Sequence, residues 1–488
     1  MTFLTPILPE FILFCSALLI LVADIYFAKN RQDFFRFTYL AALLACFLTL
    51  FFISQNDFAT ATFYNRMFFT NSFTCFVKFV SVILLIFVII LSLNFIANNK
   101  EISAEFIALM MISTVGSMFL ISSNDFMTFY LALELQSLPL YLLAAMNKKS
   151  ARSAESGVKY FILGSTASGL LLLGISLFYG FSGTTNFDAA FHIYQQHPVP
   201  PAVVLGFILI LIAMFFKISA APFHMWTPDV YQGASSVVTT FFATSAKFSA
   251  ALIFVRLFLD VSTGFVGIEQ VLILVALTSL TVGSLGAIMQ RNIKRLLAYS
   301  SIGHIGFVIL GLSAISLEGI KSCVIYMTIY AFLSIGTFGF LNLIFGIKNS
   351  KNAGEDDISD EKIFNISSFK GLAKTNPFLA AIFTILMFST AGIPPMAGFF
   401  AKFYVISAIV KSGYITTAII AILFSVISAF YYLRIVKIMY FEPANQDSLK
   451  FINRLNPKIV VGAMASFNLL FIGFMKQFIA MINTMVGF

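Results

Sequence analysis

Runs of mostly apolar residues recur along the whole chain, and short polar stretches separate them. A helix needs about 20 apolar residues to cross a bilayer. By this measure the chain contains fourteen candidate spans, at residues 3–27, 37–54, 72–96, 105–122, 125–146, 157–181, 202–224, 236–259, 267–290, 296–316, 320–345, 377–408, 413–440 and 459–483. The first run is long and no small-residue cleavage site follows it, so we expect a retained span. The pattern predicts an all-α polytopic membrane protein.

Two of these spans are interrupted. The seventh contains SAAP (219–222), and the twelfth contains AGIPPMAG (391–398) and is too long for one straight helix. An interrupted helix leaves backbone groups unpaired, which a membrane tolerates only beside buried protein or a watery cavity. Grouping spans 4–8 and 9–13 puts a broken helix in fourth place in both groups, and an odd number of spans inverts consecutive groups. The sequence therefore predicts two inverted five-helix repeats.

The composition agrees with a membrane protein and excludes other classes. Of the 488 residues, 59% are hydrophobic and 10% charged, with a mean hydropathy of +0.95. The net charge of +9 therefore reflects membrane topology and does not indicate nucleic-acid binding. The four cysteines lie singly in apolar segments, at Cys15, Cys46, Cys75 and Cys323. Without CxxC, GxGxxG or P-loop patterns, we expect no metal, iron–sulfur or nucleotide site.

Lysine and arginine in the loops predict the orientation, since inner loops carry the excess of positive charge. If the N-terminus lies outside, the inner loops hold eighteen such residues and the outer loops three. The outer three are Arg66, Lys321 and Lys411, and the inner set is Lys29, Arg31, Arg36, Lys100, Lys148, Lys149, Arg152, Arg291, Lys294, Arg295, Lys348, Lys351, Lys362, Lys370, Lys374, Lys450, Arg454 and Lys458. Both termini are therefore expected on the outer side. The one long polar connection, 346–376, contains NAGEDDISDEK and is expected to be a mobile surface loop.

Charged residues inside the spans fall into two groups. A lysine reaches roughly 6 Å along its helix, so charges within about five residues of a span end can reach the headgroups. This explanation covers Lys159, Arg256, Arg434 and Lys437, and by a narrower margin Lys78 and Lys476. It fails for Glu134, Lys217, Lys247 and Lys402, which lie roughly 10–17 Å from the span end that matters. Isolated in lipid, each would cost at least about 2.5–3.5 kcal/mol.

The three lysines and Glu134 must therefore face one another or a hydrated interior. A static ion pair accounts for one lysine with the glutamate and leaves two lysines unpaired. In general, desolvation lowers the pKa of a lysine and a nearby carboxylate raises it, so moving one charge changes the proton affinity. A Schiff-base role would need a carbonyl-binding pocket, of which the sequence has no sign. These residues predict a proton relay.

Several segments together resemble one known family. They are LPEFILF (8–14), FYLALELQSLPLYLLAAMNK (129–148), FKISAAPFHMWTPDVYQGA (216–234), the region of Lys247, AYSSIGHIGF (298–307) and FSTAGIPPMAGFFAKFYV (388–405). The chain resembles the antiporter-like subunits of bacterial proton-translocating NADH:quinone oxidoreductase (respiratory complex I), in its N-type form. Lysine at 402 favours the N-type over the M-type, which has glutamate there. The absence of a long C-terminal lateral helix argues against the L-type.

The resemblance implies a fold and a set of site residues. It implies three N-terminal helices (1–104), two inverted five-helix half-channels (105–259 and 260–440) and a C-terminal helix (441–488). The family's essential glutamate falls on Glu134, and its lysines fall on Lys217, Lys247 and Lys402. The family motif VYEGAPTPVT reads VYQGASSVVT (230–239) here, with Gln232, Ser235 and Val237 in place of the acid and two prolines. This departure puts in doubt a carboxylate or a rigid turn at that point.

The histidines leave alternatives open. His304 lies where a relay between Lys247 and Lys402 could pass, and it is equally compatible with a hydrogen-bonded core histidine. His224, at the inner end of the broken helix, is a second relay candidate, with an interfacial position as the alternative. His192 and His197 lie in an outer loop and carry no signal. Trp226 is typical of an interface anchor.

The resemblance implies a subunit of a redox-driven proton translocase in a bacterial inner membrane, with a mitochondrial inner membrane as the alternative. We expect no cofactor in this chain, and NADH, FMN, iron–sulfur clusters and quinone in partner subunits. Its partners would be other membrane-arm subunits, the lipid bilayer and protons, without nucleic acid. Two other functions remain open: a cation/proton antiporter subunit of the same fold, and a purely structural membrane-arm subunit.

Overall fold

The computed structural model describes residues 5–27, 31–55, 60–98, 103–147, 150–196, 198–261, 267–347, 362–444, 449–452 and 454–486. Some of the predictions concern residues outside these ranges. They are the predicted mobility of the loop 346–376 over residues 348–361, the loop residue His197, and the inner-loop lysines Lys29, Lys100, Lys148, Lys149, Lys348 and Lys351.

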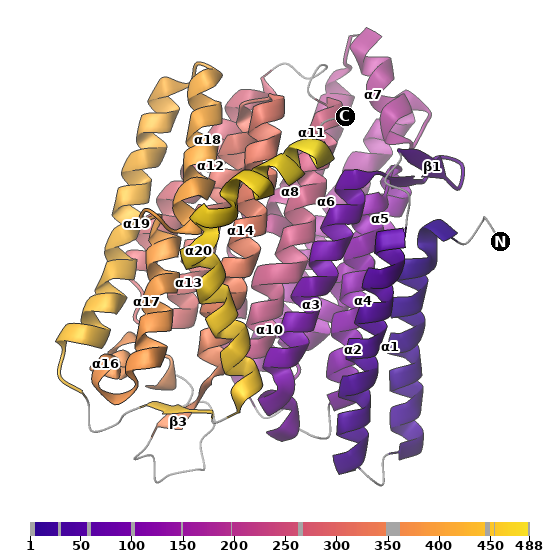
Figure 1. The fold of residues 1–488 in the computed structure, drawn as a ribbon. Helices are drawn as coiled ribbons and strands as arrows, with labels where there is room; N and C mark the ends of the chain where they lie inside the picture. The colour runs from indigo at the N-terminus through magenta and orange to yellow at the C-terminus, as the bar shows by residue number, and fades with distance from the viewer. Residues whose placement is uncertain are drawn as a thin grey trace.

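Long helices that run roughly side by side make up the molecule (Figure 1). Thirteen spans in the described part of the chain are long and apolar enough to cross a bilayer, and α17 with α18 forms one more, interrupted crossing. The prediction of about fourteen membrane-spanning segments is therefore confirmed. The helices are α1 (Leu8–Phe27, after the short turn η1, Thr5–Ile7), α2 (Arg31–Gln55), α3 (Ser72–Asn98), α4 (Ser103–Ser122), α5 (Phe126–Ala144), α6 (Ala151–Ser182), α8 (Pro201–Ile218), α10 (Ser236–Phe241), η4 (Phe242–Ala246), α11 (Lys247–Val261), α12 (Ile268–Ile288), α13 (Ile293–Ser313), α14 (Leu317–Asn342), α17 (Pro377–Ala391), α18 (Ala397–Lys411), α19 (Ile415–Phe441) and α20 (Leu455–Val486).

Short elements close the two ends of the helix bundle. At the upper end in Figure 1 lie α7 (Phe187–Gln196) and the antiparallel hairpin of β1 (Ala61–Phe63) and β2 (Phe68–Thr70). At the lower end lie η5 (Ile366–Phe369), α16 (Leu372–Thr375) and the antiparallel pair β3 (Ile344–Ile347) and β4 (Leu449–Phe451). The lower strand pair ties the connection after α14 to the start of α20.

The helix formed by α10, η4 and α11 lies in the middle of the bundle. All residues in an apolar stretch of 18 residues along this helix are buried, whereas α2, α19 and α20 bury a third or less of the residues in a stretch of the same length. The last helix, α20, crosses the bundle diagonally and packs on α3, α14 and α17 (Figure 1). It therefore joins the N-terminal helices to the second half of the chain, while the outer helices leave apolar faces for lipid or partner subunits.

Both predicted breaks are confirmed, and their local structures are alike. The first separates α8 from the short helix α9 (Trp226–Gly233), and the second separates α17 from α18. Each begins with a residue at positive φ, Ser219 (67°) and Gly392 (86°). The next N–H closes the helix with the same pattern, from Ala220 to the Phe215 carbonyl (2.8 Å) and from Ile393 to the Phe388 carbonyl (3.0 Å). A proline follows the positive-φ residue by three positions in both breaks. These parallels favour two copies of one structural unit.

Candidate functional site

Glu134 and Lys217 each form a hydrogen bond with a serine, and the two serines are different. Glu134 is half-buried on α5 and accepts a hydrogen bond from Ser168 of α6. One helical turn further along α5, Ser137 accepts a hydrogen bond from Lys217 Nζ. Lys217 is buried in the last turn of α8, where the carbonyl end of the helix favours a cation. No ion pair within 4.0 Å joins Lys217 to Glu134, so the static pair considered from the sequence is not present.

Lys247 follows directly after a π-helical turn. This turn, η4, interrupts the regular hydrogen bonding between α10 and α11, and such turns are frequent at functional sites. The Lys247 ammonium donates to Ser301 Oγ of α13 (3.0 Å) and lies 5.5 Å from the centre of the Tyr231 ring. The side chain is buried and forms no ion pair in the described structure.

Lys402 forms hydrogen bonds at the second break. From α18 its Nζ donates to the Ala391 carbonyl, the last of α17 (2.8 Å), and to Ser425 Oγ of α19 (3.0 Å). A cation at this position faces the negative end of a half-helix, which favours charge there. Its ammonium lies 5.5 Å from the centre of the Phe307 ring. Lys217 Nζ likewise lies 6.0 Å from the centre of the Tyr141 ring. All three lysines thus have a serine hydroxyl and an aromatic ring beside them, and none forms an ion pair within 4.0 Å in the described part of the chain.

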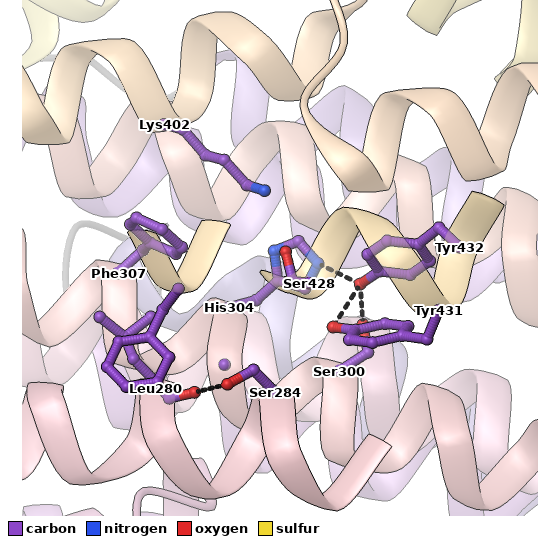
Figure 2. A pocket seen from close by; sticks show the side chains of 11 residues that line it. Leu280, Ser284, Ser300, His304, Phe307, Lys402, Ser428, Tyr431 and Tyr432 are labelled. Atoms are coloured by element: carbon purple, nitrogen blue, oxygen red, sulfur yellow. Dashed lines mark hydrogen bonds between the residues drawn. The ribbon is translucent and has the colours of Figure 1, made fainter. Parts of the chain in front are cut away.

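His304 lies between Lys402 and a group of hydroxyls (Figure 2). Its Nδ1 is 2.7 Å from the hydroxyl of Tyr326, and its Nε2 is 3.4 Å from that of Tyr432. Tyr432 in turn shares a hydrogen bond with Ser300 and accepts one from Tyr431 (3.4 Å). A cavity of about 20 Å³ borders His304 and Lys402, room for about one water molecule. The two hydroxyl contacts satisfy the core-histidine alternative. The cavity, which polar and apolar side chains both line, adds a place for a water molecule beside Lys402.

Two further candidates, His224 and Trp226, lie in the first break and at the start of α9. His224 is half-buried in the turn between α8 and α9, with its ring centre 6.5 Å from that of Tyr299. Trp226 is buried and does not anchor the chain at the membrane interface, so that prediction is wrong. Its indole N–H donates to the Phe216 carbonyl (3.0 Å) and its ring stacks on Tyr160 (4.4 Å between centres). The tryptophan therefore supplies a second donor at the broken end of α8, beside the Ser219 N–H, which donates to the same carbonyl (3.1 Å).

The altered motif around Gln232 lies beside a carboxylate that sequence reasoning passed over. Asp229 forms ion pairs with Lys159 (2.9 Å) and Arg295 (2.6 Å), and Arg295 also donates to Gln232 Oε1 (3.2 Å). Partial burial raises the pKa of Asp229, but the hydrogen bonds and charges of Lys159 and Arg295 outweigh it and lower the pKa below its ordinary value. Ser235 caps α10 by accepting from the Val238 N–H (3.5 Å). Gln232 and Ser235 thus form hydrogen bonds in this segment, although the acid and the prolines of the family motif are absent.

Two residues that were expected to reach the headgroups are buried in the protein instead. Lys78 is fully buried and forms an ion pair with Glu10 of α1 (2.6 Å). Arg256 is also buried and donates to the carbonyls of Ile121 (2.6 Å) and Ser123 (2.9 Å), at the end of α4. A short distance to the end of a helix does not bring a side chain to water if other elements of the protein cover that end. Glu10, an acid inside the first apolar run, was the sequence signal for the buried pair.

Sequence reasoning also missed the hydroxyl partners Ser137, Ser301 and Ser425, because serine is common in helices and carries no spacing signal. Among the described residues, no cluster of three or more His, Cys, Asp or Glu side chains could hold a metal ion.

Comparison with known proteins gives a consistent result. The family model described as NADH:quinone oxidoreductase/Mrp antiporter, TM, matches residues 123–428. A protein named NADH-quinone oxidoreductase subunit N from Paramagnetospirillum magneticum is 41% identical over 448 residues, covering 90% of this chain and 88% of that protein. The protein of the same name from Bartonella bacilliformis is 39% identical over 475 residues, covering 96% of this chain and 94% of that protein.

A solved structure agrees with these relatives. A chain of respiratory complex I from Thermus thermophilus, determined with bound aureothin, superimposes with a TM-score of 0.79 at 26% identity, covering 97% of this chain and 98% of that one. The chain therefore belongs to the NADH:quinone oxidoreductase/Mrp antiporter membrane family, and within it to the subunits N of NADH-quinone oxidoreductase.

Proposed function

We propose that this chain is the proton-translocating membrane-arm subunit N of an NADH:quinone oxidoreductase, and that Glu134, Lys217, Lys247 and Lys402 form its relay. One observation carries the relay: three buried lysines each rest on a serine hydroxyl without a carboxylate partner. A buried ammonium without a counter-ion is costly, so its proton is held less firmly than in water. Such a group can take up and release a proton when a nearby charge moves.

The path runs from α5 to α19. Lys217 donates to Ser137 of α5, one helical turn from Glu134, whose carboxylate can draw closer or move off. Lys247 donates to Ser301, which is one turn from His304 on α13. His304, with hydroxyls at both ring nitrogens, leads to the cavity that it shares with Lys402. His224 lies on the break beside Lys217 and is a candidate for exchange with the aqueous side, in keeping with its half-buried position.

The proposal assigns parts of the chain to roles. Residues 105–259 and 260–440 would form the two half-channels, with 1–104 and 441–488 as flanking helices. The similar breaks after Phe215 and Phe388 support two such units. From the loop charges we place both termini on the outer side of a bacterial inner membrane. NADH, FMN, iron–sulfur clusters and quinone would bind in partner subunits, and quinone reduction there would supply the energy.

Mutagenesis of the assembled complex tests the relay. Lys217→Ala and Lys247→Ala should each abolish most NADH-driven proton pumping, measured in inverted vesicles, while the complex still assembles. Lys437→Ala is the matched control, because Lys437 is an exposed lysine near the end of α19. Normal pumping by assembled Lys217→Ala and Lys247→Ala complexes would refute the relay. An antiporter would be recognised differently: it would purify without FMN-containing, NADH-oxidising partners.

A further inference from the structure

Gln136 lies on α5 between Glu134 and Ser137, the serine that accepts a hydrogen bond from Lys217. Its side chain joins three helices at the centre of the bundle. Its side chain is fully buried on α5. Its Nε2 donates toward Ser117 Oγ of α4 (2.8 Å), Ser249 Oγ of α11 (2.9 Å) and the Ala246 carbonyl (3.1 Å). Ala246 is the last residue of the π-helical turn, and Lys247 follows it. The amide therefore holds the backbone one residue before a relay lysine.

The backbone of Gln136 is itself fixed against α4. Ser113 Oγ donates to the Gln136 carbonyl (2.9 Å). On the same side Gly116 lies so close that a Cβ there would meet the Gln136 nitrogen at 2.3 Å. The side chain thus extends from a rigid point on α5, and displacements of α5 relative to α11 are transmitted to the π-helical turn.

The π-helical turn determines where Lys247 points. A π-turn holds one residue more than the α-turn it replaces, and successive residues of an α-helix differ by about 100° around the axis. Relaxation of η4 to α-helix would therefore swing Lys247 by about this angle, away from Ser301. The Ala246 carbonyl accepts from Gln136 Nε2 and from Ser249 Oγ (3.2 Å), and Gln136 also donates to that serine, so the amide stabilises the turn as it is. Gln136 Oε1 has no hydrogen-bond partner, so the amide is held through its N–H groups alone.

We propose that Gln136 is a positioning residue that holds the π-helical turn before Lys247 and thereby couples α5, the helix of Glu134 and Ser137, to the direction of Lys247. The inference rests on the proposed relay and assigns it a mechanical link. Movement of α5 when the charge on Glu134 or Lys217 changes would reach Lys247 through this amide, without a direct contact between the two lysines.

The test replaces the amide in the intact complex. Gln136→Met keeps the size of the side chain and removes its donors. We expect assembled complex whose NADH-driven pumping falls at least about fivefold, the factor that corresponds to about 1 kcal/mol. Cryo-electron microscopy of this variant should find η4 relaxed to α-helix, or Lys247 Nζ beyond hydrogen-bond reach of Ser301. Gln290→Met is the matched control, because it makes the same substitution just after α12, where the amide donates to the Gly286 carbonyl (2.9 Å) and takes no part in the proposed coupling.

Each outcome has one meaning. Pumping by Gln136→Met equal to that of Gln290→Met, or an unmoved Lys247, overturns the inference. If Gln136→Met does not assemble, Gln136→Leu also removes the donors and is judged by the same measures. Failure of both to assemble, with Gln290→Met intact, overturns it in favour of a folding role. If Lys247→Ala loses pumping while Gln136→Met pumps normally, only the coupling is refuted. If Lys247→Ala itself pumps normally, the relay is refuted.

Discussion

The buried ion pair between Lys78 and Glu10 makes a prediction independent of the relay. Both side chains are essentially inaccessible, and their charged atoms are 2.6 Å apart. Lys78 Nζ also lies 4.6 Å from the centre of the Phe68 ring, which the β1–β2 hairpin places over this end of α3. At an effective dielectric constant of about 20, two unit charges at this distance attract by roughly 6 kcal/mol. Desolvation costs several kcal/mol per ion, so the net contribution of the pair is small.

Removing one partner is different from removing both. Lys78→Met leaves the Glu10 carboxylate buried and unpaired, and Glu10→Gln leaves the ammonium in the same state. Each single change should destabilise the subunit by about 3–5 kcal/mol. The double variant buries no charge, so it should recover most of that loss. The pattern expected is two unstable single variants and one near-normal double variant.

The assay is the half-life of the purified complex at a fixed elevated temperature, followed by native electrophoresis. A half-life suits a large membrane complex better than an equilibrium free energy, since unfolding there is not two-state. Lys476→Met, at an exposed lysine of α20, is the control. The reasoning is refuted if either single variant matches the wild type, or if the double variant is no more stable than the worse single one.

Two further predictions concern the segment around α9. Trp226→Phe keeps an aromatic ring on Tyr160 but removes one of two donors to the Phe216 carbonyl, where the Ser219 N–H (3.1 Å) remains. The complex should therefore lose about 0.5–1.5 kcal/mol of stability, measured as a shorter half-life at elevated temperature. Asp229→Asn should reduce stability near neutral pH, and the difference from the wild type should disappear as the pH falls through the depressed pKa of Asp229. A carboxyl whose pKa is lower in the folded state stabilises the protein above its unfolded pKa and loses that contribution in acid. A stability difference between the variant and the wild type that persists in acid would contradict this prediction.

Hydropathy and charge along the chain were enough to predict the membrane class, the crossings and both breaks. Apolar runs of bilayer length leave the backbone no alternative to helix. At both breaks a proline follows a small residue at positive φ and the helix ends there, whereas Pro139 is accommodated inside α5. The reach argument also selected Glu134, Lys217, Lys247 and Lys402, because a charge near the middle of a span cannot reach water along its own helix.

Only the tertiary structure decided what surrounds these charges. Lys78 lies near the start of α3, yet α1 and the β1–β2 hairpin cover it, and no rule about distance along one helix contains that information. The serines beneath the three lysines and the amide of Gln136 come from other helices far away in sequence. Periodicity specifies which face of a helix is apolar, but side-chain packing between helices determines which polar group meets which. The sequence alone therefore determined which residues carry charge into the membrane, and the packing of the helices determined their partners.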